Sequence, residues 1–168
     1  MRKQLYLDIK NRLKTITDGN GNQLFRHFDL WNRQVEFIEQ ETPFVCPAVF
    51  VEFDRIDWHT LSKKVQDCNL HVRLHIVTEW HSDTADYSPT EQQALEFLNI
   101  ADKVTKTLQG FTTNYMNGWM RTASITNHDH ETYVDTVEEY TCYLRDVSAY
   151  GEGIPVQVTG VVVTKQEP

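Results

Sequence analysis

The sequence has few of the residues that cross-link a chain or anchor it in a membrane. Its three cysteines, Cys46, Cys68 and Cys142, are an odd number at wide spacing. We therefore expect reduced, buried thiols in a cytosolic protein and no disulfide framework. No apolar run approaches the roughly 20 residues that a membrane span needs. The opening MRKQLYLDIKNRL lacks an uninterrupted apolar region, which predicts a mature helix and not a signal peptide.

Cations are also scarce. The chain has 16 Lys and Arg against 24 Asp and Glu, a net charge of −8, and its longest basic pairing is Lys63-Lys64. Phosphate contacts need clustered cations, so this balance argues against a general nucleic-acid binder. The 168 residues, 40% of them hydrophobic, suffice for one domain with a true core.

Catalytic and metal-binding motifs are sparse. The sequence has no phosphate-binding glycine loop, nucleophile elbow or zinc-protease helix motif. The tightest cluster of possible metal ligands is His128-Asp129-His130-Glu131, and a metal site needs several such donors around one ion. No partner motif occurs elsewhere, which favours a solvated turn between two strands. A small metal-binding or ligand-binding domain that uses this turn is the alternative from a different functional class.

Two other patterns resemble metal sites and fail as such. His71 and His75 share a strand face but lie about 13 Å apart along it, so they cannot bind one ion together. With Arg73 they predict a semi-exposed face that a neighbouring subunit can cover. Asp18, Asn20 and Asn22 imitate the start of a calcium loop, but Gln23 stands where glycine is required, which predicts a capped turn.

Aromatic residues fall largely in or beside predicted loops. Aromatic side chains at protruding positions are enriched in protein–protein interfaces. The interface candidates are therefore Phe44, Trp58, Trp80 and Tyr87, together with the face of His71, Arg73 and His75. The alternative is that the aromatic residues seal the ends of the sheet in their own domain, a group that also includes Phe25, Trp31, Tyr115 and Trp119.

Hydrophobic periodicity predicts an α+β fold, a mostly antiparallel sheet packed with two helices. The single domain spans residues 1–168. The predicted helices cover residues 3–17 and 90–109, and the predicted strands cover residues 23–31, 34–38, 48–53, 69–79, 119–126, 136–147 and 155–164. Residues 155–168 form either an extra edge strand or an arm that reaches a neighbour.

The order of these elements carries a family resemblance. The helix LYLDIKNRLKTI is followed by the proline-led strand CPAVFVEF, the alternating strand NLHVRLHIVTEW, the helix EQQALEFLNIADKVTKTLQGF, and the closing strands GWMRTASITNHDH and DTVEEYTCYLRDVSA. From Leu5 to Ala149 the chain resembles the phage tail-terminator family, also called tail-completion or minor tail proteins. Members of this family carry no invariant catalytic residues, so the resemblance rests on element order.

The resemblance implies a structural protein with no enzymatic activity and no cofactor. Such proteins form a ring, commonly hexameric, at the head-proximal end of the tail tube, where they end tube growth and join the tail to the head connector. The implied partners are copies of the chain itself, the tail tube protein and the head–tail connector protein, with no membrane. A connector or neck protein is the alternative within this class.

The same resemblance implies a location and a lumen. The protein would belong to the virion and be assembled in the cytoplasm of the bacterial host. DNA would pass through the ring without specific binding, which an acidic lumen favours. The acidic residues predicted in loops are the candidates for lining it: Glu36, Glu39, Glu41, Asp54, Asp57, Asp83 and Asp86.

Overall fold

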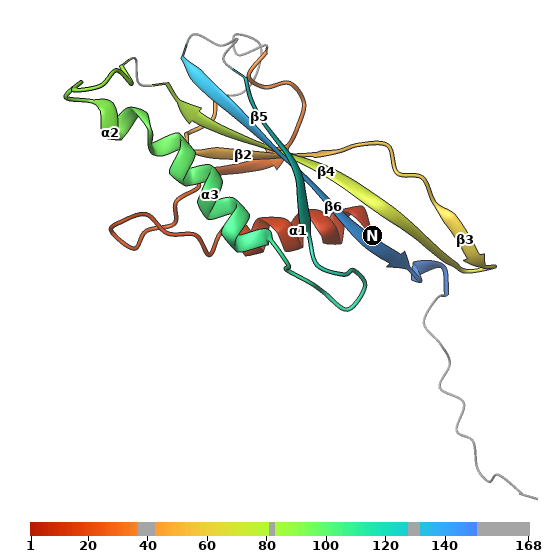
Figure 1. Ribbon diagram of the computed structural model, residues 1–168. Helices are drawn as coiled ribbons and strands as arrows, with labels where there is room; N and C mark the ends of the chain where they lie inside the picture. Colours follow the sequence, from red (N-terminus) through yellow and green to blue (C-terminus); the bar gives the residue numbers. More distant parts are fainter. Residues whose placement is uncertain (37–42, 81–82, 128–131, 151–168) are drawn as a thin grey trace, which may run out of the picture.

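The computed structural model describes residues 1–36, 43–80, 83–127 and 132–150 (Figure 1). Its elements, in chain order, are α1 (Arg2–Leu13), β1 (His27–Leu30), β2 (Ala48–Phe53), β3 (His59–Ser62), β4 (Val65–Glu79), α2 (Glu91–Ala94), α3 (Glu96–Leu108), β5 (Met120–Asn127), β6 (Tyr133–Asp146) and the 3-10 turn η1 (Ser148–Tyr150). The predicted α+β class is confirmed.

The sheet is mostly antiparallel, as predicted. Its strand order is β1-β2-β4-β6-β5, and β3 pairs separately with β4. Only β1 and β2 run parallel among the described strands. The central pair is β4 and β6, whose ladder extends from Gln66 opposite Asp146 to Glu79 opposite Tyr133. Within the described chain, β1 and β5 are the outer strands of this order.

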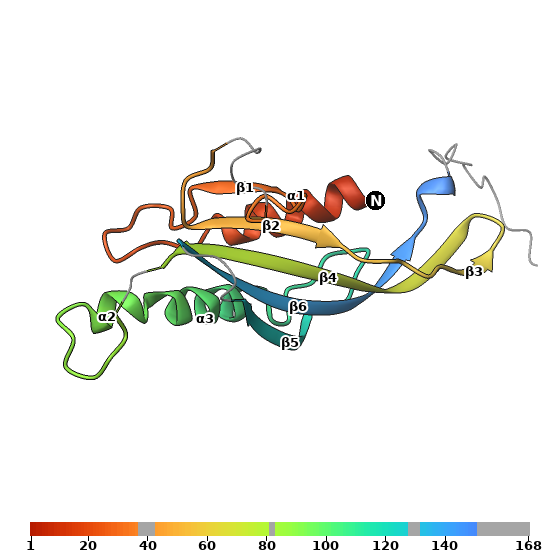
Figure 2. The ribbon, with the colours of Figure 1, turned by 90° about the horizontal axis from the view of Figure 1, so that it is seen from above.

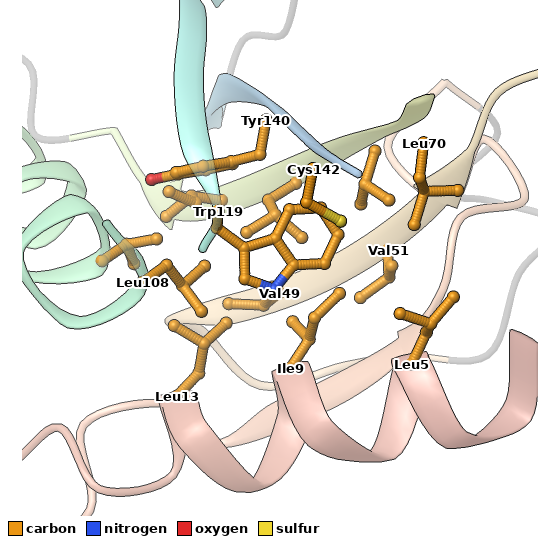
Figure 3. Packing of buried hydrophobic residues seen from close by; sticks show 14 of the residues in the cluster. Leu5, Ile9, Leu13, Val49, Val51, Leu70, Leu108, Trp119, Tyr140 and Cys142 are labelled. Atoms are coloured by element: carbon orange, nitrogen blue, oxygen red, sulfur yellow. The ribbon is translucent and has the colours of Figure 1, made fainter. Parts of the chain in front are cut away.

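Both long helices pack on one face of the sheet. Leu5, Ile9 and Leu13 of α1 recur at four-residue steps and are buried, because this spacing places them on one side of a helix. They meet alternate residues of the strands, such as Leu70 and Val49, in one cluster that also holds the buried side of α3 (Figure 3). Burial of an aliphatic side chain is worth about 1.5–3 kcal/mol, so this cluster fixes both helices to the same face.

The structure corrects several predicted boundaries. The helix predicted at 90–109 is divided into α2 and α3 at Leu95, and the first helix ends at Leu13. Residues 34–36 form a turn where a strand was predicted, and the predicted connection 54–68 contains β3. The strand predicted at 155–164 lies outside the described residues.

The β3–β4 hairpin extends beyond the helices at one end of the molecule (Figures 1 and 2). β4 is the longest strand described, with 15 residues from Val65 to Glu79. At about 3.3 Å per residue, its two ends are roughly 45 Å apart. All four residues of β3 are exposed. β4 therefore links an exposed hairpin at one end to the body of the domain at the other.

Candidate interaction surfaces

The face of the sheet opposite the helices, here called the helix-free face, carries a network of charges. The Arg73 guanidinium of β4 lies 2.9 Å from Glu139 of β6, 3.4 Å from Glu52 of β2 and 3.2 Å from Asp54. These carboxylates, Glu139 first, raise the pKa of Arg73 above its ordinary value. The network joins three strands by charge pairing, so the predicted polar face is present around Arg73.

His75 is buried, which corrects the prediction that it lies on a semi-exposed face. The Trp31 ring stacks on the imidazole with centroids 3.6 Å apart and an angle of 3° between the planes. His75 Nδ1 lies 2.9 Å from Asp135, and Nε2 lies 3.3 Å from Glu52. His71, nearer the hairpin, is exposed and Arg73 is partly exposed, so the prediction of a semi-exposed face holds for these two residues. The chain itself covers His75, and no neighbouring subunit is needed there.

A shallow cleft of about 610 Å³ opens beside this buried histidine. Its lining comes from Trp31, Glu36, His75, Ile125, Thr126, Asn127, Asp135 and Val137. Asp135 is buried, and its Oδ1 has no hydrogen-bond partner within the described structure. Among the described residues, no group of three or more His, Cys, Asp or Glu side chains is placed to hold a metal ion. The arrangement suits a polar contact with another surface.

Most of the aromatic interface candidates belong to the core or its margins. Phe44 packs edge-on to Phe50 at 5.0 Å, and Trp58 packs against the main cluster. Trp80 lies 6.3 Å from Phe97. Tyr87, by contrast, is 92% exposed. Phe44 and Trp58 therefore pack within their own domain, as the alternative interpretation expects. Tyr87 is the exposed member of the set.

The cysteines are free thiols, as predicted. Cys68 and Cys142 are buried, and Cys46 is partly buried. Burial raises the pKa of Cys46 and of Cys142 to about 12, so neither forms the reactive thiolate at neutral pH.

The calcium-like pattern at Asp18 and the cluster of possible metal ligands at residues 128–131 have different outcomes. Asp18 Oδ1 accepts hydrogen bonds from the backbone N–H groups of Asn20 and Asn22, which confirms the predicted capped turn. The ligand cluster at residues 128–131 lies outside the described residues.

A second, more apolar cleft of about 330 Å³ lies between α3, the end of β4 and the turn before β1. It was not predicted, because its lining residues are scattered along the chain: Asp18, Leu24, Cys46, Pro47, Thr78, Glu79, Gln93, Ala94, Glu96, Phe97 and Ile100. The side chain of Thr78 is buried, and its Oγ1 has no hydrogen-bond partner in the described structure. An apolar cleft with such a polar atom suits a protruding side chain better than a rigid flat surface.

Comparison with known proteins gives distant structural likenesses, one of which is described here. No protein-family model matches the chain, and no curated protein matches it. A solved chain described as part of the "Virion of native gene transfer agent (GTA) particle" matches at 10% identity with a TM-score of 0.48, over 84% of this chain and 95% of that one. A likeness at this level leaves function to be argued from the residues. None of the described helices is long and apolar enough to cross a membrane.

Proposed function

We propose that this chain is a non-enzymatic structural protein of a phage or prophage virion. Copies of the chain form a ring at the head-proximal end of the tail tube, end its growth and join it to the head connector. The assembled location is the virion, with assembly in the bacterial cytoplasm. No cofactor takes part.

The observation that carries the proposal is an outer strand, β5, that the described residues leave exposed. β5 is exposed along almost its whole length, with Ile125 53% and Met120 51% exposed. An outer strand with free backbone groups can pair with another chain, and repeated heterologous contacts close into a ring when the rotation permits. The order of the elements, which resembles that of tail terminators, is the reason for proposing a ring on the tail tube and not another assembly.

The acidic character of the chain supports passage of DNA without adhesion. On the helix-free face the carboxylates Glu52, Asp54 and Glu139 surround the single guanidinium of Arg73. Of the predicted lumen residues, Asp57 pairs with Arg55 and Asp83 accepts a backbone hydrogen bond, while Glu39 and Glu41 lie outside the described residues. An excess of carboxylates on a surface repels the DNA backbone.

The test combines solution mass, imaging and a capping assay. We expect purified protein to form a closed ring by light scattering and electron microscopy, and to stop the growth of tail tubes at one end. A ring that binds the connector but leaves tube growth unchanged would favour the neck-protein alternative. A protein that stays monomeric at high concentration and fails to cap tubes would contradict the proposal.

A further inference from the structure

The apolar cleft beside α3 has an acidic rim. Asp18, Glu79 and Glu96 line it together with apolar side chains such as Leu24 and Phe97. Lys103 pairs with Glu96 at 3.4 Å, and Arg26 lies near enough to lower the pKa of Asp18 after the stronger backbone hydrogen bond from Asn22. The three carboxylates outnumber these two cations, so the rim keeps a net negative charge. In the described structure, neither of the two cations forms an ion pair with Glu79.

The tip of the β3–β4 hairpin has the complementary composition. Leu61 is 53% exposed, and the adjacent Lys63 and Lys64 are exposed as well. Lys64 Nζ lies 5.9 Å from the centroid of the Tyr150 ring. From Leu61 to Lys64 the tip contains two cations and no carboxylate. An exposed leucine beside two ammonium groups matches an apolar cleft with a negative rim.

The tip and the cleft of one chain cannot meet. The hairpin adjoins Val65 at the first residue of β4, whereas Thr78 and Glu79 at its last residues line the cleft. The strand holds them roughly 45 Å apart at about 3.3 Å per residue. Two complementary surfaces at opposite ends of one strand have the placement that a head-to-tail contact between copies requires.

We propose that the hairpin tip of each copy inserts into the cleft of the next copy. Leu61 enters among Leu24, Phe97 and Ile100, and the two lysines pair with the acidic rim. The buried Thr78 hydroxyl then gains a polar partner from the incoming chain. This inference rests on the proposed ring and adds to it the surfaces through which neighbouring copies bind.

A charge-reversal experiment tests the contact. The variant K63E/K64E and the variant E79K/E96K should each associate at least about tenfold more weakly than wild type, measured by light scattering across a dilution series. A mixture of the two variants should regain association, because each contact between unlike variants again joins opposite charges. The control variant K3E/K14E makes the same change of charge as K63E/K64E at two exposed positions, one in the first turn of α1 and one just after its last residue, and should associate like wild type.

The outcomes separate this inference from the proposed function. Rings that form equally well in K63E/K64E and in E79K/E96K would overturn the inference and leave the ring intact. Loss of association that the mixture does not restore would also overturn it, since the surfaces would then bind something other than each other. A wild type that remains monomeric would overturn both.

A cross-linking measurement tests the same contact without altering charge. Gln93 lines the cleft and is exposed, and Ser62 lies at the tip. Under oxidising conditions S62C/Q93C should form a ladder of disulfide-linked oligomers, because each chain then carries one exposed thiol at each end. The ladder should be absent from S62C alone and from Q93C alone. A dimer that S62C forms by itself would show tip-to-tip pairing and contradict the proposal, as would the lack of a ladder in S62C/Q93C.

Discussion

At the scale of single residues, Trp119 is the largest fully buried side chain. It is 1% exposed, and Figure 3 shows its indole among Tyr140, Cys142 and the aliphatic residues of α1. Its Nε1 has no hydrogen-bond partner in the described structure. The ring therefore stabilises the fold through apolar packing, and its removal leaves a cavity between the helices and the sheet.

Trp119→Ala is expected to lower the free energy of unfolding by about 3–5 kcal/mol, the usual cost of removing a buried aromatic ring. Urea denaturation followed by circular dichroism measures the change. Met120→Ala, at the adjacent and 51% exposed position, is the control and should change stability by no more than about 0.5 kcal/mol. Similar losses for both variants would contradict the described packing.

Asp18 gives a pH-dependent prediction. The backbone hydrogen bond from Asn22 is the main cause that lowers the pKa of Asp18 below its ordinary 3.8. The stabilisation is present above the ordinary pKa and is lost as the pH falls through the lowered one. Wild type should therefore be more stable than Asp18→Asn at neutral pH, and the difference should shrink below about pH 4. Denaturation at several pH values measures it, and a constant difference would contradict the assignment.

The histidines of β4 show which properties of a single residue can be predicted: the face of the strand on which it lies, but not its exposure. Period-two alternation correctly places His71, Arg73 and His75 on the face opposite Leu70 and Val72. It does not reveal that Trp31 folds over His75, because this contact joins residues 44 positions apart in the chain. Alternation specifies a face of a strand, and distant side chains decide whether that face is covered.

At the scale of elements, strong local patterns were predicted well and weak ones were not. β2 has the predicted bounds, Ala48–Phe53, because Pro47 precedes this largely apolar run and Asp54 follows it. β3 was missed, since HTLS is short, polar and stabilised only by pairing with β4. The division between α2 and α3 at Leu95 was missed because no glycine or proline marks it in the sequence. The clefts were missed because residues distant in sequence form them.

The approach of two glycines after α3 provides an element-scale prediction. A Cβ on Gly118 would lie 3.0 Å from the backbone Cα and O of Gly110. Gly118→Ala should therefore push apart the segments that enclose Trp119 and lower the free energy of unfolding by about 1–3 kcal/mol. Gly19→Ala is the matched control, since no atom lies within 4 Å of its added methyl group. Equal denaturation midpoints for the two variants would contradict this close approach.

At the scale of the whole molecule, a metal titration tests the alternative functional class. A ligand that binds only the folded state raises apparent stability by an amount that grows with the logarithm of its concentration relative to its dissociation constant. Under the proposed structural function, the chain should show the same thermal midpoint with and without zinc, manganese or calcium. A rise that His128→Ala/His130→Ala abolishes would instead support a metal-binding function for that turn.

The long ladder between β4 and β6 also has a consequence for the timing of assembly. Its outermost pair joins Gln66 to Asp146, 80 positions apart, so the chain must close a long loop before the central ladder of the sheet is complete. Topologies dominated by such distant pairings fold slowly, in roughly milliseconds to seconds. β4 carries the hairpin at one end and two residues of the cleft lining at the other. Both surfaces are therefore complete only when this ladder has formed. Under the proposed contact between hairpin tip and cleft, a nascent polypeptide therefore lacks both binding surfaces, and only subunits that have finished folding should associate.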